Sequence, residues 1–332
     1  MGTDGTTRRT VLAGGAACGL LAGSRIAEAQ SGGLQKVKLV TNWFAQAEHG
    51  GFYQARETGL YEKAGVDVAI EMGGPQMNDI QLLVAGRCDV VLSQPDQVMT
   101  GLQNGLPLVA IATTFQKGLG GLMTHPSITD LSQLKGHPIL ISEEERTGAW
   151  QWLQKKYGFS PSQAGTYTFN LQPFVLNPEL AMQAFATSEP YAAQKRGIPY
   201  RFFLLSDYGY GGFGNLLVTT GPVLQRKQAA LAGFLKAGME GWKSFLEGDN
   251  APAKRAIMAQ NPAMSSDQID WSVAALKRMN ALGEPGARFG RMNDAQWAQT
   301  ARIAASIGVI PASLDWRPGY TLQFDDVMTA TV

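Results

Sequence analysis

The amino-acid sequence predicts an α/β protein with mostly parallel sheets. From residue 37 onward, short apolar runs typical of strands alternate with segments whose apolar residues recur at helical spacing, as in parallel sheets with crossover helices. Two glycine-rich stretches, residues 116–121 and 208–214, bracket a middle unit. A middle unit inserted between the two ends of a chain predicts two lobes joined by two chain crossings, which together form a hinge. We therefore expect lobe I at 34–115 plus 215–332, and lobe II at 116–214.

The N-terminal residues 1–29 are predicted to be an export signal rather than part of the fold. Arg8 and Arg9 precede an apolar Gly/Ala-rich run, and Ala27 and Ala29 form a small-x-small cleavage site, the pattern of a secretory signal. The paired arginines favour twin-arginine export, with a Sec signal as the alternative. Lipidation at Cys18 is disfavoured because no leucine stands three residues before it. We expect a periplasmic protein.

Composition and motifs exclude several classes of function. The 332 residues are 45% hydrophobic and 17% charged with a net charge of +1, which argues against a nucleic-acid partner. After signal cleavage Cys88 stands alone, and the three histidines lack zinc-ligand spacing. The sequence contains no nucleophile elbow, phosphate loop or dinucleotide fingerprint. We expect no catalytic residues, no metal and no cofactor.

In the first third, the predicted strands follow one another with a helix after each. Helices are expected at 49–58, from an N-cap at Asp79, and from Gln94-Pro95-Asp96. The predicted strands are 37–40, 66–71, 90–93 and 108–113.

The rest of the chain continues the alternation and then becomes helical. A helix is predicted over 147–157, and another has Pro190 at its first position. Strands are expected at 139–142, 166–170, 202–205 and 216–219. The last third should form helices over 223–247 and 251–260, and then from Ser265 and Asn293, which begin capping boxes.

Several motifs of the first third resemble the NMT1/THI5-like family, and the later Glu189-Pro190-Tyr191 does too. These motifs are Asn42-Trp43-Phe44, His49-Gly50-Gly51-Phe52-Tyr53-Gln54-Ala55, Gly59-Leu60-Tyr61, Gly65-Val66-Asp67-Val68, Gly73-Gly74 and residues 81–90. The family comprises periplasmic binding proteins of ABC importers for thiamine-pyrimidine precursors and related small molecules. The resemblance implies a type II periplasmic-binding-protein fold, in which a hinge closes two lobes over a ligand cleft. It also implies aminopyrimidines, flavin-like rings, sulfonates or nitrate as ligand classes.

The same superfamily contains an enzyme, the pyrimidine synthase of fungal thiamine biosynthesis. It resembles this chain through residues 89–92, after which the synthase has a lysine for pyridoxal phosphate and, four residues later, a histidine. The matching residues here are Ser93 and Gln97. Serine cannot form the Schiff base, so the resemblance implies binding without catalysis.

The loop after the first strand carries four candidate ligand-binding residues, because ligands of α/β sheets bind at the carboxyl ends of strands. Trp43 could stack on a planar ring, and Asn42 could bind the edge of that ring. His49 is a further polar contact, and Gly50 would let a ligand approach the backbone. The alternatives are a core tryptophan, a turn-capping asparagine and a surface histidine. Glu48 is expected only to complement the helix dipole.

Other strand-to-helix loops supply the remaining candidates. Ser93 and Gln94 follow the third strand, where Asp96 could instead cap a helix. Glu189 could accept a hydrogen bond from an exocyclic amine, and its alternative is an N-cap, a role that Glu fills poorly. Tyr191 belongs to the same motif, and Tyr210 is a candidate lid aromatic. Residues 142–146 are expected to be a solvated helix start.

The expected function is capture of a small heteroaromatic, pyrimidine-like ligand and delivery to an ABC permease in the inner membrane. We expect a monomer. A binding protein for an aromatic carboxylate or sulfonate is the main alternative, and such a ligand would require a cationic clamp. An exported sensor protein and a pyridoxal-phosphate-dependent synthase are the others.

Overall fold

The computed structural model describes Met1 and residues 33–74, 77–146 and 148–331. The predicted export signal and Cys18 lie outside this part of the chain, apart from Met1. Residues 34–332 form one compact unit. None of the helices described is both long enough and apolar enough to cross a membrane.

The first sheet contains the strands expected from the first third of the chain and one later strand. Its order is β2-β1-β3-β10-β4. β1 pairs in parallel with β2 and β3, whereas β10 runs antiparallel to both β3 and β4. The bounds are β1 (Gln35–Val40), β2 (Val66–Glu71), β3 (Val90–Ser93), β4 (Leu108–Thr113) and β10 (Leu216–Thr220).

The second sheet is built only from the middle of the chain, in the order β7-β6-β8-β5-β9. β6 is parallel to β7 and β8, and β5 is antiparallel to β8 and β9. The sequence prediction missed β5, because its residues were assigned to a glycine-rich crossing. The bounds are β5 (Gly120–Thr124), β6 (Ile139–Ile141), β7 (Ala164–Thr166), β8 (Ala181–Phe185) and β9 (Arg201–Leu204).

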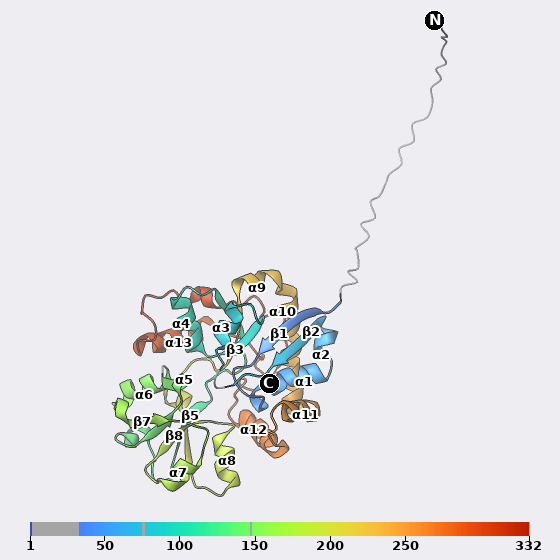
Figure 1. Ribbon diagram of the computed structural model, residues 1–332. Helices are drawn as coiled ribbons and strands as arrows, with labels where there is room; N and C mark the ends of the chain where they lie inside the picture. Colours follow the sequence, from blue (N-terminus) through green and yellow to red (C-terminus); the bar gives the residue numbers. More distant parts are fainter. Residues whose placement is uncertain (2–32, 75–76, 147, 332) are drawn as a thin grey trace. The chain divides into compact units, whose positions relative to one another are not determined.

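Each sheet thus has one reversed strand, and each reversed strand is the first one that the chain enters after crossing between the sheets. The two crossings lie side by side: Thr114 N donates to Asn215 O at 2.7 Å, and Gly214 N donates to Phe115 O at 2.9 Å. Figure 1 shows α5–α8 with β5, β7 and β8 in one half of the picture, and α3, α4, α9 and β1–β3 in the other.

Around the first sheet lie helices whose starts match the predicted caps. Ser265 and Asn293 accept hydrogen bonds from the backbone N–H groups of Gln268 and Gln296. At the third helix the N-cap is Asn78 rather than Asp79. The predicted helix 223–247 is two helices, with a break at Lys227. The bounds are α1 (Gly50–Glu57), α2 (Leu60–Lys63), α3 (Asp79–Val84), α4 (Pro95–Gln103), α9 (Gly221–Arg226), α10 (Gln228–Glu247), α11 (Ala251–Gln260), α12 (Ser266–Arg278) and α13 (Asp294–Ser306).

The second sheet carries shorter helices and most of the 3-10 turns. A strand was predicted over residues 166–170, but the observed strand is β7 (Ala164–Thr166), and the chain after Thr166 is irregular. The α-helices are α5 (Glu143–Arg146), α6 (Ala149–Tyr157), α7 (Gln172–Leu176) and α8 (Glu189–Lys195); the 3-10 turns of the chain are η1 (Ala47–His49), η2 (Leu131–Leu134), η3 (Pro161–Gln163), η4 (Leu205–Tyr208) and η5 (Arg317–Gly319).

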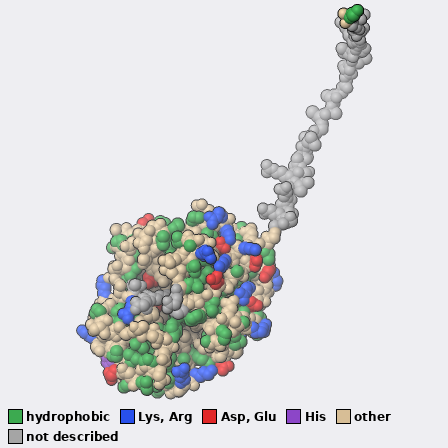
Figure 2. Space-filling view, viewed as in Figure 1, with side chains coloured by type: hydrophobic (Ala, Val, Ile, Leu, Met, Phe, Trp, Pro, Cys, Tyr) green, Lys and Arg blue, Asp and Glu red, His purple; other side chains and the backbone are tan. Residues whose placement is uncertain are grey.

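The largest core lies where α1 crosses α10. Trp242 and Phe52 are fully buried, with ring centroids 5.9 Å apart in edge-to-face geometry. The helices approach closely at glycines: a Cβ atom on Gly241 would lie 2.2 Å from Gly51 O. This packing fixes the position of η1 and the loop before it. On the face seen in Figure 2, positive and negative side chains are interspersed, which agrees with the near-neutral net charge.

Candidate functional site

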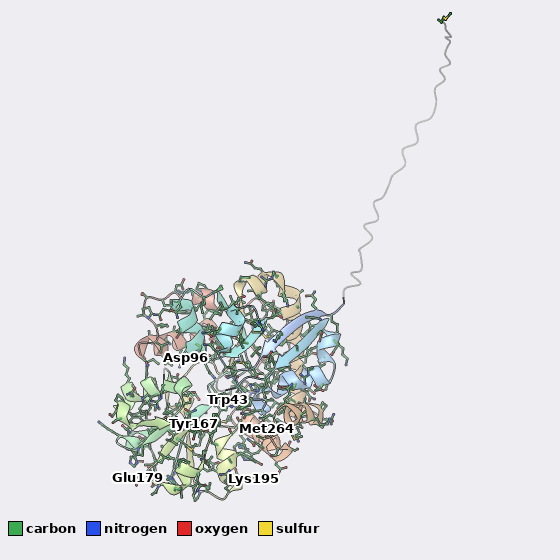
Figure 3. All side chains as sticks on the ribbon, in the orientation of Figure 1. Trp43, Asp96, Tyr167, Glu179, Lys195 and Met264 are labelled. Atoms are coloured by element: carbon green, nitrogen blue, oxygen red, sulfur yellow. The ribbon has the colours of Figure 1, made fainter. Side chains whose placement is uncertain are left out.

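A cavity of about 200 Å³ is lined by residues of the second sheet and by residues that follow strands of both sheets. Parallel strands present their carboxyl ends at one sheet edge, where ligands of α/β proteins bind. The cavity is reached by residues after β1 and β3 of the first sheet, and by residues after β6, β7 and β8 of the second. Figure 3 shows Trp43, Asp96 and Tyr167 in the middle of the molecule, in contrast to Glu179 and Lys195 at its periphery.

The charge of the lining is one-sided. Four acidic residues line the cavity, and no lysine or arginine is among the described residues that do so. An anionic ligand would face repulsion from these carboxyl groups and meet no cationic partner in this lining. The four acids are Glu48, Asp96, Glu145 and Glu189.

Six of the residues predicted from the sequence line this cavity: Asn42, Trp43, His49, Gln94, Glu189 and Tyr210. His49 Nε2 lies 3.4 Å from Asn42 Oδ1, and Gln94 Nε2 donates to Asn215 Oδ1 at 2.9 Å. The first pair extends from the end of β1 to η1, and the second joins the start of α4 to a chain crossing. The side chains are therefore held by one another before any ligand is present.

Three of the predicted residues do not line the cavity, and the structure gives each another role. Gly50 packs against the ring of Phe245, which a Cβ atom there would approach to 2.2 Å. Ser93 is fully buried and donates its hydroxyl to Gln97 Oε1 at 2.8 Å. Tyr191 accepts a hydrogen bond from Lys195 Nζ at 3.0 Å. Its place in α8 explains this, since it is two residues beyond Glu189 and so faces a different direction.

Aromatic rings from both sheets meet at one wall. The ring of Trp43, after β1, lies 4.9 Å from that of Phe169, after β7. Phe169 in turn lies 4.8 Å from Tyr167. Phe169 has a positive φ of 59°, a conformation unfavourable for a bulky residue. Phe169 was not predicted to line the site, because residues 166–170 were predicted to form a strand.

Tyr210 and Asp96 face each other over Gly148. A Cβ atom at Gly148 would lie 2.7 Å from Tyr210 Oη and 2.9 Å from Asp96 Oδ2. Burial raises the pKa of Asp96, and burial together with the nearby Asp96 charge raises the pKa of Tyr210 well above its ordinary value. Asp96 lines the cavity, whereas the sequence predicted a helix cap as its alternative role. Ser142 and Glu145 also line the cavity, so the prediction of a solvated face at 142–146 is wrong for these two.

Glu189 is buried and already hydrogen-bonded. Its Oε1 accepts from the Tyr167 hydroxyl, and its Oε2 accepts from Phe185 N at 2.7 Å. Burial raises the pKa of Glu189, against the opposing effect of these hydrogen bonds. Each carboxylate oxygen has a second lone pair, so the residue holds two neighbours in place and still borders the cavity.

Glu48 is only 6% exposed and lines the same cavity. Thr187 follows β8, and its hydroxyl donates a hydrogen bond to Glu48 Oε1. Burial raises the pKa of Glu48, and the neighbouring Glu189 charge adds to this. Glu48 was expected only to complement the helix dipole, but its side chain is buried and contacts Thr187, next to the second sheet.

His49 is expected to stay neutral at ordinary pH. Burial lowers its pKa from 6.5 to about 3, so the folded protein resists a proton that the unfolded chain accepts below pH 6.5. The contribution of neutral His49 to the free energy of unfolding is fully present above pH 6.5 and is lost progressively as the pH falls towards 3. From this residue alone, unfolding should become easier by about 2 kcal/mol between pH 7.5 and 5. Urea unfolding at both pH values checks this, and His49→Gln should reduce the difference; an unchanged difference would contradict it.

The chain is similar in sequence to one described family and to several characterised proteins. The profile of a family described as NMT1/THI5 like matches residues 46–250. A formylaminopyrimidine-binding protein of Halalkalibacterium halodurans is 21% identical over 285 residues, covering 80% of this chain and 83% of that protein. A 4-amino-5-hydroxymethyl-2-methylpyrimidine phosphate synthase of Schizosaccharomyces pombe is 29% identical over 154 residues, covering 44% of this chain and 43% of that protein.

Solved structures confirm the fold class expected from the sequence. The periplasmic aliphatic sulphonate binding protein SsuA of Escherichia coli superimposes with a TM-score of 0.64 at 15% identity, covering 86% of this chain and 91% of that one. The periplasmic nitrate-binding protein NrtA of Synechocystis superimposes with a TM-score of 0.63 at 13% identity, covering 90% of this chain and 92% of that one. The chain therefore has the fold of the periplasmic binding proteins.

Proposed function

Because the chain belongs to the NMT1/THI5-like family, we propose that it is an exported solute-binding protein that captures a small amino-substituted heteroaromatic ligand, pyrimidine-like in size, for an ABC importer. The observation that carries this is the cavity itself, which has an aromatic wall and four acidic residues, with no cation among its described lining residues. Carboxylates and amides accept hydrogen bonds from exocyclic amines, and Trp43 offers a face for a planar ring.

The mechanism is closure about the paired chain crossings. In this proposal residues 34–115 plus 215–332 form one lobe and residues 116–214 the other, with the strands of each sheet inside one lobe. Hydrogen bonds between the two crossings at residues 114–115 and 214–215 would let the lobes turn while the ends of β4 and β10 stay joined. Ligand bound to both lobes favours the closed state by its additional contacts, as differential binding requires. The closed form would be delivered to a permease in the inner membrane.

An anionic ligand is the main alternative, and the charge of the lining opposes it. A sulfonate or carboxylate needs cationic or multiple N–H donors. Arg146, at the end of α5 and adjacent to the lining residue Glu145, is not among the described lining residues, and its Nη2 donates to Gly165 O at 3.4 Å.

Synthase activity is opposed by the buried polar pair at the end of β3. Ser93 stands where the synthase resemblance requires a lysine, and its hydroxyl is committed to Gln97. Pyridoxal phosphate should therefore form no Schiff base at position 93, because serine has no amine.

The ligand class is tested by a thermal-shift screen of the purified mature protein. We expect aminopyrimidines such as 4-amino-5-hydroxymethyl-2-methylpyrimidine and its formylamino relatives to raise the melting temperature, because a ligand that binds only the folded state stabilises it by mass action. Benzoate, methanesulfonate and nitrate should not. If only the anions raised the melting temperature, the proposed ligand class would be wrong.

Trp43→Ala is expected to weaken aminopyrimidine binding by at least about fivefold, since a lost aromatic stacking contact is worth about 1 kcal/mol beyond its buried area. Trp43→Phe keeps a ring at the position and should retain most of the affinity. Isothermal titration calorimetry on the two variants checks this. Equal affinities for Trp43→Ala and the wild type would remove Trp43 from the site.

A further inference from the structure

Glu48 combines deep burial with an unpaired oxygen. The residue is only 6% exposed, and it lines the cavity. Oε1 accepts a hydrogen bond from the Thr187 hydroxyl. Oε2 is also buried, and no described residue donates a hydrogen bond to it. A buried acceptor without a donor is costly, so such groups usually have a partner in the functional state.

The surroundings of Glu48 supply negative charge but no positive charge. The acidic group that acts on it through space is Glu189 from the second half of the molecule. His49, the adjacent ring, is neutral at ordinary pH because its pKa is about 3. No lysine or arginine is among the lining residues described. A ligand in the cavity that Glu48 lines could therefore supply the donor that Oε2 lacks.

The opposite side of Glu48 is firmly held. Thr187 follows β8, and its carbonyl oxygen accepts a hydrogen bond from Ser272 Oγ at 2.9 Å. Ser272 lies in α12 and is 1% exposed. The chain of contacts from Ser272 through Thr187 to Glu48 orients the carboxyl group, so that Oε2 is presented in a defined position.

We propose that Glu48 makes the cavity selective for ligands that carry an N–H donor or a cationic nitrogen. In this proposal Oε2 accepts a hydrogen bond from that group. The inference rests on the proposed function and adds to it the residue that distinguishes an amino group from an oxo group of the same size. A carbonyl oxygen at that place would leave Oε2 unpaired and put two acceptors against each other, which a site built for N–H groups rejects.

The test compares matched ligands on matched variants. The ligands are 4-amino-2-methylpyrimidine against 2-methylpyrimidin-4-one, and benzamidine against benzoate. The proteins are the wild type, Glu48→Gln, and Glu62→Gln as a control with the same substitution at an exposed site. Glutamine keeps the shape of Glu48 but removes its charge and replaces one acceptor by a donor. Calorimetry at pH 7.5 measures the affinity ratio within each pair.

We expect the wild type and Glu62→Gln to prefer the amino and amidine members, and Glu48→Gln to reduce the preference by roughly ten- to a hundredfold, the range for a hydrogen bond to a charged group. A merely structural role would weaken both members of a pair equally and leave the ratio unchanged. Circular dichroism and the melting temperature establish that the variant is folded. Thr187→Val, which removes only the hydroxyl that orients Glu48, should reduce the same ratio by a smaller factor.

The outcomes separate the two proposals. If aminopyrimidine binds and Glu48→Gln leaves its ratio unchanged, the role of Glu48 is overturned while the proposed function stands. If only benzamidine binds, with a ratio that falls in Glu48→Gln, the pyrimidine assignment fails and the role of Glu48 stands. Preference of the wild type for pyrimidinone and benzoate, or no binding of any of the four, would overturn the role of Glu48.

Discussion

Gly241→Ala is expected to destabilise the protein by about 3 kcal/mol, at the upper end for an added methyl group in a packed interior. The new Cβ would lie 2.2 Å from Gly51 O, 2.7 Å from Ala55 Cβ and 2.9 Å from Ala55 N. Two of these contacts are to the backbone of α1, which cannot rotate away. The helices α1 and α10 would have to separate, and the fully buried Trp242 between them would lose contacts.

A matched control is available in the neighbouring helix. Gly221 at the start of α9 has no atom within 4 Å of a Cβ position, so Gly221→Ala should be neutral or stabilising by about 0.5 kcal/mol through the unfolded chain. Urea unfolding followed by tryptophan fluorescence gives both free energies. Similar losses in the two variants would mean that the close approach of α1 and α10 is not the cause.

Glu189→Ala is expected to lower the stability of the ligand-free protein by about 2–4 kcal/mol. The truncation leaves the Tyr167 hydroxyl and the Phe185 N–H without their acceptor in a buried site, and each unsatisfied buried group costs about 1–3 kcal/mol. Relief of a buried carboxylate offsets part of this, since burial raises the pKa of Glu189. The variant should also bind aminopyrimidines more weakly, by roughly 1–3 kcal/mol.

Glu189→Gln separates the two effects of Glu189. It retains one acceptor oxygen and so should lose less stability than Glu189→Ala, while it still lacks the negative charge that favours an amine. Urea unfolding without ligand measures the first effect, and calorimetry measures the second. Full stability in Glu189→Ala would contradict the hydrogen-bonding role, and unchanged calorimetric affinity would remove Glu189 from the ligand contacts.

The site could be predicted where a functional side chain follows a strand directly. Asn42 and Trp43 lie within three residues of the end of β1, and Gln94 directly follows β3; strand ends are recognisable from local patterns. Ser93 was predicted to lie in the loop after β3, but it is the last residue of that strand and its side chain is fully buried. Alternation of side chains along a strand makes such a one-residue difference decisive.

Phe169 and Glu48 could not be found in this way. Phe169 lies in an irregular segment, and its contact with Trp43 joins opposite halves of the molecule. Glu48 has the appearance of an ordinary acid near a helix start, and only its bond to Thr187, 139 residues away, turns it into a buried group. Spacing along the chain carries no information about such partners.

By itself, therefore, the sequence determined the strands of the first sheet, the helix caps at Ser265 and Asn293, and the loops that carry Asn42 and Gln94, because these depend on neighbours a few residues apart. The tertiary structure alone decided which strands are reversed, that four acids and no described cation line one cavity, and that Glu48 accepts a hydrogen bond from Thr187. Those features depend on contacts between distant segments, whose free energy is realised only when both halves of the chain have folded against each other.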